Sequence, residues 1–231
     1  MLLAAGEGRR LRPFTDDRPK PMIAIAGRPI LEHTVRLLAR YGVRDLAINL
    51  HYHPESIVDH FGDGRRFGVR IQYSRESELL GTAGAVKKLE SFFDEPFLVV
   101  YGDNLTDIDV ERFSAFHRAH SALVTIALFH RENATASGIV GFADDGRVTR
   151  FLEKPRPDEI FSNWVNAGIL IAEPAILAHI PSAGPSDFGR DVLPALLAAG
   201  LPVFGYRMTE NLYWIDSPED YQRTQELVTS L

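Results

Sequence analysis

Two glycines and a run of basic side chains occupy the loop that opens the chain, LLAAGEGRRLRPFTDDRPKPM at residues 2–22. Gly6 and Gly8 allow a sharp turn that brings backbone N–H groups close to an anion. Residues 7–20 include five cationic and three anionic side chains, although the whole chain has a net charge of −6. The cations are Arg9, Arg10, Arg12, Arg18 and Lys20. We interpret this segment as a polyphosphate-binding loop, and a loop that merely turns is the alternative.

The spacing of the loop excludes two common phosphate motifs. Leu11 stands where the dinucleotide fingerprint G-x-G-x-x-G needs its third glycine, and no G-K-[ST] follows as in a P-loop. A nicotinamide-dependent dehydrogenase is disfavoured for the same reason.

Acidic side chains follow three apolar segments in distant parts of the chain. Asp103 lies near the end of FLVVYGDN, directly after Gly102, and Asp216 lies in LYWIDSPEDY. Mg²⁺ favours one or two protein carboxylates, so these aspartates could share one cation, although each could instead be a turn residue. Glu153 and Lys154 follow the third segment in RFLEKP, where an exposed ion pair is the alternative to a binding role.

The segments that position these residues alternate between the sequence patterns of strands and those of helices. Apolar runs predict strands and amphipathic runs predict helices, which together indicate parallel βαβ units with ligands at the carboxyl edge of the sheet. The early strands are 2–5, 46–50, 69–73 and 97–101, and the helices are 29–42, 54–61 and 81–93. After residue 120 the pattern favours strands at 123–129, 138–142, 148–153 and 164–171, followed by a helix that begins at Pro218 behind a capping box of Ser217 and Asp220. We predict an α/β fold with a doubly wound, mostly parallel mixed sheet, Rossmann-like, in a single domain over residues 1–231.

Bulk composition restricts the function classes. The absence of cysteine excludes disulfides, thiolate nucleophiles and cysteine-ligated metals. A net charge of −6 argues against binding to nucleic acid or to an acidic membrane surface. No apolar run approaches the roughly 20 residues of a membrane span, and the apolar start MLLAA is too short for a signal peptide. We therefore expect a cytoplasmic protein.

Six motifs occur in the order found in the sugar-1-phosphate nucleotidyltransferases, which the chain resembles over essentially its whole length. They are LAAGEGRRLRPFTDDRPKPM, LLGTAGAV, VVYGDN, FLEKP, WVNAGIL and YWIDSPEDY. LGTAGAV and FGRDVLPALL are most similar to the mannose-1-phosphate guanylyltransferase branch. The resemblance implies a glycosyltransferase-A-like nucleotidyltransferase fold and a Mg²⁺-dependent reaction that joins a nucleoside triphosphate to a sugar 1-phosphate and releases pyrophosphate.

The resemblance also assigns roles to individual residues. The catalytic set is Arg10, Lys20, Asp103 and Asp216, of which Asp103 and Asp216 would hold Mg²⁺. The nucleotide-binding set is Leu3, Ala4, Ala5, Gly6, Gly8, Arg9, Glu76, Glu78, Gly81 and Thr82. The set that would bind the sugar phosphate is Gly102, Glu153, Lys154 and Asn166.

The identity of the base and sugar depends on fewer residues. Glu76 and Glu78 precede the Gly81–Thr82 turn, and a carboxylate can accept both N1–H and the 2-amino group of guanine. This favours GTP, with mannose 1-phosphate as the expected sugar, whereas two solvated loop acids are the alternative reading.

Other substrates and functions stay open. They include N-acetylmuramate, heptose or glucose 1-phosphate with UTP, GTP or dTTP, a cytidylyltransferase for an alcohol phosphate, and a non-catalytic, nucleotide-sugar-binding regulatory subunit. We expect a nucleoside triphosphate and a sugar 1-phosphate as partners and no C-terminal left-handed β-helix. The sequence leaves homo-oligomer formation open.

Overall fold

The structure, a computed structural model, describes residues 1–229 and forms two compact units, each described by itself below. Unit 1 combines Met1–Leu79, Tyr101–Asp107 and the stretch that begins at Asn211, and unit 2 combines Leu80–Val100 with Ile108–Glu210. The single domain expected over 1–231 stays a prediction, and its last two residues lie outside the described part of the chain.

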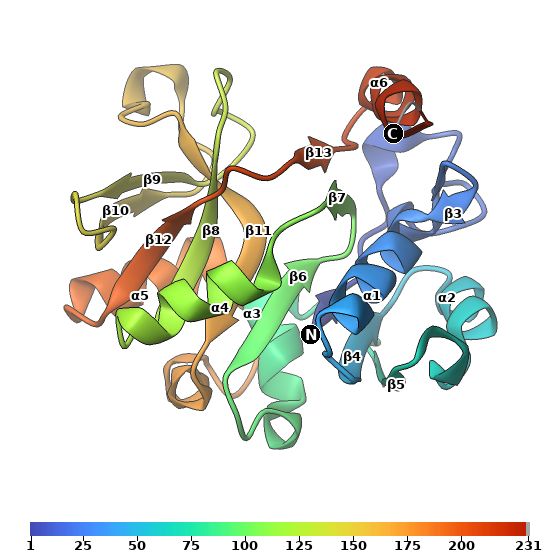
Figure 1. Ribbon diagram of the computed structural model, residues 1–231, viewed down its shortest axis with the longest axis horizontal. Helices are drawn as coiled ribbons and strands as arrows, with labels where there is room; N and C mark the ends of the chain where they lie inside the picture. The colour runs from blue at the N-terminus through green and yellow to red at the C-terminus, as the bar shows by residue number, and fades with distance from the viewer. Residues whose placement is uncertain (230–231) are drawn as a thin grey trace. The chain divides into compact units, whose positions relative to one another are not determined.

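Unit 1 contains the parallel strands predicted for the first part of the sequence. β1 (Leu2–Leu3) pairs with β4 (Asp45–Leu50), and β4 pairs with β5 (Arg70–Arg75). The register places Leu3, Asn49 and Ser74 side by side across the three strands. Helix α1 (Ile30–Arg40) precedes β4 and α2 (Pro54–Phe61) precedes β5, as expected for βαβ units (Figure 1).

The rest of unit 1 consists of short strand pairs and a terminal helix. β2 (Ala24–Ile25) forms a hairpin with β3 (Arg28–Pro29), and β7 (Asn104–Thr106) pairs antiparallel with β13 (Leu212–Trp214). Helix α6 (Pro218–Thr229) begins at the predicted proline and contacts β2. A buried apolar cluster joins these pieces: Leu11, Ile23, Ile25, Ile30, Leu105 and Ile215.

Unit 2 contains the strand-rich segment. Its central strand β11 (Trp164–Ala172) pairs antiparallel with β6 (Phe97–Tyr101, of which Val100 is the last residue in this unit), β8 (Val124–His130) and β9 (Ile139–Phe142). β10 (Val148–Leu152) forms a hairpin with β9, and β12 (Val203–Arg207) runs parallel to β8. The predicted α/β class with a mixed sheet is confirmed.

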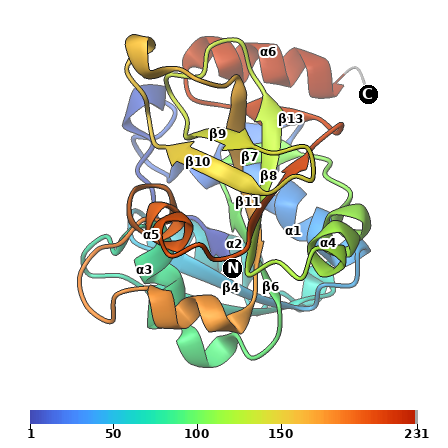
Figure 2. The same ribbon diagram turned by 90° about the vertical axis from the view of Figure 1, so that its left-hand side faces the viewer.

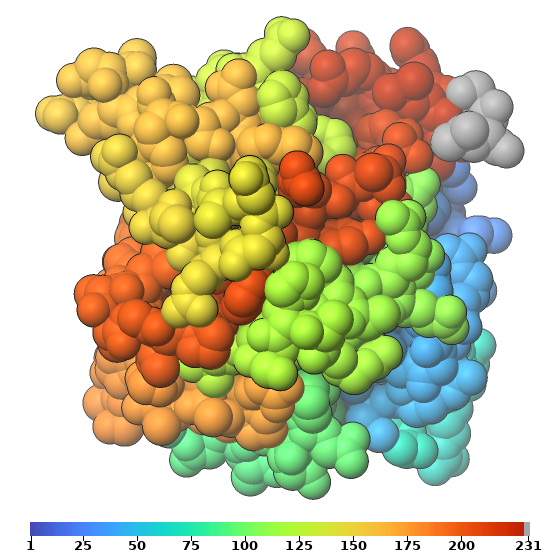
Figure 3. Space-filling view, turned by 60° about the vertical axis from the view of Figure 1, so that its left-hand side comes forward, coloured from blue at the N-terminus to red at the C-terminus, as the bar shows by residue number. Residues whose placement is uncertain are grey.

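Three α-helices accompany the strands of unit 2: α3 (Gly81–Lys88), α4 (Val110–Ala119) and α5 (Leu193–Ala198). Helix α5 contacts β10 and β12, as Figure 2 shows for α5 and β10. On the surface in Figure 3, the yellow β9–β10 hairpin borders the orange segment of α5 and β12 and the green helix α4.

Short helical turns complete the described chain. A π-helical turn, Phe188–Val192, runs directly into α5. The 3₁₀ turns are Arg9–Leu11, Lys20–Met22, Arg65–Phe67, Glu90–Phe92, Pro157–Glu159 and Pro174–His179. Within residues 1–229, no helix has both the length and the apolar character needed to cross a membrane.

Candidate functional site

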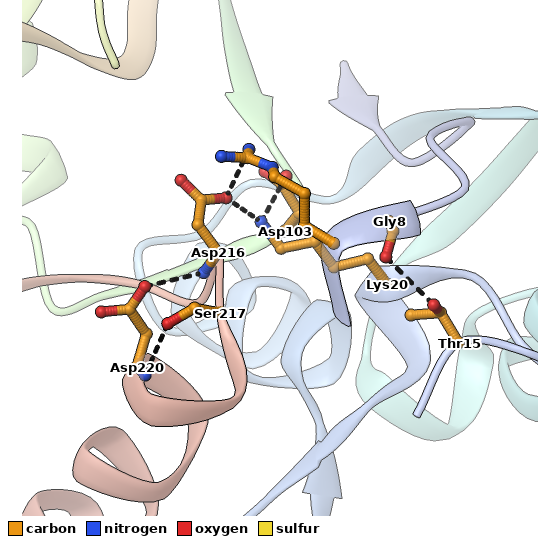
Figure 4. Close-up of polar contacts among 8 residues, drawn as sticks. Gly8, Thr15, Lys20, Asp103, Asp216, Ser217 and Asp220 are labelled. Carbon is orange, nitrogen blue, oxygen red and sulfur yellow. Dashed lines mark hydrogen bonds and ion pairs between the residues drawn. The ribbon is translucent and has the colours of Figure 1, made fainter. Parts of the chain in front are cut away.

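Asp103 and Asp216 lie on either side of the Lys20 ammonium group in unit 1. Lys20 Nζ donates to Asp103 Oδ2 and to Asp216 Oδ1, each at 2.9 Å (Figure 4). The antiparallel pairing of β7 with β13 explains this proximity, because Asn104 pairs with Trp214, Asp103 directly precedes Asn104, and Asp216 is the second residue after Trp214. The predicted convergence of the two aspartates is therefore present.

The cation between the aspartates is largely removed from water. The Lys20 side chain is 7 % exposed, whereas those of Asp103 and Asp216 are 37 % and 24 % exposed. Burial alone would lower the pKa of Lys20, but the two carboxylates outweigh burial and hold this pKa above its ordinary value. Lys20 is therefore charged at neutral pH. Arg10 adds a second, exposed cation, with its Nη2 3.3 Å from Asp216 Oδ1.

The glycine loop is folded tightly against Lys20. Gly8 has a φ of 68°, and a Cβ atom at this position would lie 2.7 Å from Lys20 Cβ. The buried Thr15 hydroxyl donates to the Gly8 carbonyl at 3.0 Å, as Figure 4 also shows. Leu11, in place of a third fingerprint glycine, is buried in the apolar cluster of unit 1. Gly6 is exposed, and a Cβ there would meet nothing within 4 Å.

The remaining loop cations pair with acids beside them. Arg9 makes two hydrogen bonds to Glu7, at 2.5 and 3.1 Å, and Arg18 makes two to Asp17, at 2.8 and 2.9 Å. Arg12 lies 3.5 Å from Asp16. These pairs are exposed and nearly neutral, so Arg10 and Lys20 are the loop cations that the structure places at the aspartates.

The carboxyl edge of the parallel strands holds a buried polar group. Asn49 accepts a hydrogen bond from the Ala4 N–H through Oδ1 and donates from Nδ2 to Glu76 Oε1, both at 2.8 Å. Glu76 is 6 % exposed, whereas Glu78 is exposed. The structure thus separates the two glutamates: Glu76 is part of a buried network that begins at the glycine loop, and Glu78 is a surface acid.

In unit 2, the Gly81–Thr82 turn is held by a later segment. Gly81 has a φ of 74°, and a Cβ there would lie 2.5 Å from the Ser186 carbonyl. The Thr82 hydroxyl donates to Asp187 Oδ1 at 3.2 Å and accepts from the Phe188 N–H at 2.9 Å. Thr82 therefore fixes the path of the chain before the π-helical turn.

Glu153, also in unit 2, lies against two glycines. A Cβ at Gly138 would be 2.7 Å from Glu153 Oε2, and one at Gly189 would be 2.4 Å from it. Burial raises the pKa of Glu153 although Lys154 and Arg190 act in the opposite direction. The absence of a side chain at both glycines therefore leaves the space for this carboxylate.

Strand β10 ends before Glu153, and Lys154 has a φ of 49°, a left-handed conformation that is uncommon for lysine. Its N–H donates to the Ser137 carbonyl at 3.2 Å. The strand predicted over 148–153 therefore ends one residue earlier in the structure, at Leu152. Lys154 is exposed.

Asn166 and Gly102, the other two residues assigned to the sugar phosphate, each make contacts that stabilise the local backbone. Asn166 Oδ1 accepts from the Gly168 N–H at 2.9 Å, where the pairing of β11 with β8 shifts register. In unit 1, Gly102 donates its N–H to the Leu3 carbonyl, and a Cβ there would lie 2.9 Å from Leu31 Cδ1. Packing accounts for this glycine, and its proposed ligand role stays a prediction.

The pair Asp103 and Asp216 satisfies the main requirement of a Mg²⁺ site. Two carboxylates already converge on one cationic nitrogen, and Mg²⁺ is commonly held by one or two carboxylates with phosphate oxygens and water. The donor set therefore fits the expected metal.

Sequence reasoning missed four residues of these clusters. Asn49 is a polar residue inside the apolar run LAINL, and this pattern by itself indicates a buried polar group with hydrogen-bond partners. Asp187, Gly138 and Gly189 gave no comparable signal, because their partners lie far away in the sequence.

Comparison with known proteins identifies the family to which this chain belongs. The family described as "Nucleotidyl transferase" matches residues 1–229. The chain is 38 % identical over 230 residues to a UTP–glucose-1-phosphate uridylyltransferase of Synechocystis sp., covering 94 % of this chain and 59 % of that protein. It is 35 % identical over 227 residues to a mannose-1-phosphate guanylyltransferase of Mycobacterium tuberculosis, covering 96 % and 62 %. The chain thus spans about three fifths of the length of these relatives.

A solved structure shares the fold. HddC from Yersinia pseudotuberculosis, complexed with GMP-PN, superposes with a TM-score of 0.82 at 25 % identity, covering 98 % of this chain and 97 % of that chain.

Proposed function

This chain belongs to the nucleotidyl transferase family, and from that premise we propose that it transfers a nucleotidyl group from a nucleoside triphosphate to a sugar 1-phosphate. A phosphate oxygen of the sugar attacks the α-phosphorus, a new P–O bond forms, and the bond to the β-phosphate breaks as pyrophosphate leaves with its electron pair. The observation that carries the proposal is the convergence of Asp103, Asp216 and Lys20 beside the glycine loop.

The residues of unit 1 are assigned to the triphosphate. Backbone N–H groups around Gly6 and Gly8 cradle the phosphates, Arg10 binds the leaving pyrophosphate, and Lys20 binds near the α-phosphate. No covalent enzyme intermediate is required, so catalysis consists of alignment and of neutralising charge that develops on phosphate oxygens. The raised pKa of Lys20 supports its part, because the side chain is protonated at neutral pH while it contacts the two carboxylates.

Asp103 and Asp216 would hold Mg²⁺, which supplies further charge neutralisation at the phosphates when it is bound. Lys20 contacts the same two carboxylates. We infer that the ammonium neutralises them before metal and nucleotide bind.

Residues of unit 2 are assigned to the sugar 1-phosphate. Lys154 binds its phosphate, and Glu153 accepts hydrogen bonds from sugar hydroxyls. The amide oxygen of Asn166 already accepts from Gly168, so the amide nitrogen is the group assigned to a hydroxyl.

For the base we propose guanine, read by Glu76. The support is its burial: a carboxylate that is 6 % exposed and whose Oε1 is held by Asn49 would present its second oxygen as an acceptor to the N1–H and 2-amino edge of guanine. Glu78, which is exposed, is not assigned this role. Mannose 1-phosphate is the proposed acceptor, in keeping with the guanylyltransferase from M. tuberculosis.

The test is pyrophosphate release with Mg²⁺, measured for each of the common nucleoside triphosphates against a panel of sugar 1-phosphates. The proposal expects turnover with GTP and mannose 1-phosphate. Turnover only with UTP and glucose 1-phosphate would show that both proposed substrates are wrong and that the proposed type of reaction is right. Nucleotide binding without any turnover would favour a regulatory subunit instead.

Assignment of the sugar phosphate is tested by Lys154→Ala, with Arg156→Ala as the matched control, since Arg156 is a nearby exposed cation that pairs with Glu159. Lys154→Ala should raise the KM for the sugar phosphate more than the KM for the nucleotide. The opposite pattern would contradict the assignment.

A further inference from the structure

We propose that Asn49 is a positioning residue that sets which hydrogen-bonding atom of residue 76 faces the nucleotide base. This inference rests on the proposed function, because it takes the side chain of residue 76 as the group that reads the base. Asn49 lies in β4, is 4 % exposed, and connects Ala4 at the start of the glycine loop with Glu76 beyond the end of β5.

The orientation of the Asn49 amide is determined by its neighbours. The Ala4 N–H can only donate, so the atom 2.8 Å from it is the carbonyl Oδ1. The amide nitrogen Nδ2 therefore points the other way and donates to Glu76 Oε1 at 2.8 Å. Because an amide nitrogen cannot accept, whichever atom of residue 76 faces Asn49 has to be an acceptor.

Residue 76 is also held through its backbone. The Glu76 N–H donates to the Leu50 carbonyl at 2.8 Å, and the Glu76 carbonyl lies 2.9 Å from His51 Nδ1. Because a carboxylate is planar, holding the backbone and one oxygen restricts where the second oxygen, Oε2, can lie. Asn49 thus determines where the second oxygen lies relative to the glycine loop.

A change of residue 76 alone should replace an acceptor with a donor at the position of Oε2, which we call the outer position. In Glu76→Gln the carbonyl oxygen has to turn towards Asn49, which places an NH₂ donor where Oε2 was. In Asn49→Asp alone, the carboxylate still accepts from Ala4 but repels Glu76, so the Glu76 side chain is no longer held.

The double variant Asn49→Asp with Glu76→Gln restores a bond of reversed direction. The introduced carboxylate accepts from Ala4 and from the introduced side-chain amide, and the amide oxygen returns to the outer position as an acceptor. A residue that served only to stabilise the strands would not produce this reversal.

The experiment compares the wild-type chain with both single variants and the double variant. The readouts are the dissociation constants for GTP and UTP by calorimetry and the ratio of kcat/KM for the two nucleotides. Each single variant should lower the GTP/UTP preference by about tenfold or more, the size expected for one lost hydrogen bond to a charged group. The double variant should return the preference to within about threefold of wild type.

Ser74→Ala is the matched control. Ser74 pairs in register with Asn49, is 4 % exposed, and loses a buried hydroxyl in the same row of the sheet. It should leave the base preference unchanged, whatever its effect on thermal unfolding.

Two results would overturn the inference: an unchanged preference in Asn49→Asp, or a double variant whose preference is no nearer wild type than that of Glu76→Gln. If Asn49→Asp does not fold, the comparison of Glu76→Gln with the double variant decides. If wild type prefers UTP, the proposed base is wrong. The inference still holds in that case if the single variants change the preference and the double variant restores it.

Discussion

Replacing Lys20 with methionine tests the charge arrangement on which the proposed chemistry depends. Methionine keeps the length and apolar stem of the side chain but removes the ammonium that contacts Asp103 and Asp216. At an effective dielectric constant of about 20, unit charges about 3 Å apart attract by about 5–6 kcal/mol. Much of this is offset by the cost of burying the ammonium, and breaking a buried pair typically costs about 3–5 kcal/mol.

The exposure of the partners lowers this figure. Because the side chains of Asp103 and Asp216 are 37 % and 24 % exposed, water can solvate part of the charge that is left behind. We therefore expect Lys20→Met to reduce the free energy of unfolding by about 2–3 kcal/mol in a metal-free buffer. Chemical denaturation with EDTA measures this loss, and Arg18→Met is the control, because the Arg18 pair is exposed and should contribute below about 1 kcal/mol.

The same measurement with Mg²⁺ separates an ion pair from a cation site. Without the ammonium, the two carboxylates should bind Mg²⁺ in its place, and a concentration ten times the dissociation constant would return about 1.4 kcal/mol of stability. Wild type should gain less, because Lys20 competes for the same oxygens. Equal unfolding midpoints for Lys20→Met and wild type in EDTA would refute the reasoning, and an equal gain from Mg²⁺ in both would refute the shared site.

Two further perturbations follow from the geometry. Gly8→Ala should lower the free energy of unfolding by about 2–4 kcal/mol, because of the positive φ at this position and the contact of a Cβ atom with Lys20. Gly27 is the control: it has a similar φ but nothing within 4 Å of a Cβ atom, so Gly27→Ala should cost about 1–2 kcal/mol. Equal losses for the two variants in chemical denaturation would contradict the role of the Lys20 contact. Because the folded-state pKa of Glu153 is raised, wild type loses stability as pH rises from the ordinary carboxyl pKa through the raised one, so Glu153→Gln should raise Tm at pH 7–8 and not at pH 4. A difference in Tm that does not change with pH would contradict this.

Local sequence patterns predicted most of the secondary structure. Residues 29–42, 46–50 and 54–61 were predicted as helix, strand and helix, and α1, β4 and α2 occupy nearly the same positions. This agreement reflects the short range of the cause, since periodic burial and capping act over a few residues. The convergence of Asp103 and Asp216 agrees with the expectation that they could share one cation, but its cause differs: it arises from the separate antiparallel pair of β7 and β13 and not from the carboxyl edge of the main sheet.

Contacts between distant segments were beyond the same reasoning. Nothing near Glu153 in the sequence indicates that Gly138 and Gly189 leave room for its carboxylate. The two-unit division is likewise hidden, because each unit is assembled from separate stretches of chain. Asn49 was the exception: a single amide within an apolar strand should have been recognised as a buried polar group in need of partners.

The pairing of β7 with β13 has a consequence for how the protein is made. The contact between Lys20 and Asp216 closes a loop of 196 positions, so it belongs to the slowest class of contacts to form. A growing chain that has not yet reached residue 211 possesses the glycine loop, Lys20 and Asp103 but lacks β13 and the second carboxylate. The two carboxylates can therefore come together around Lys20 only after the stretch from residue 211 to Asp216 has been synthesised and has folded back.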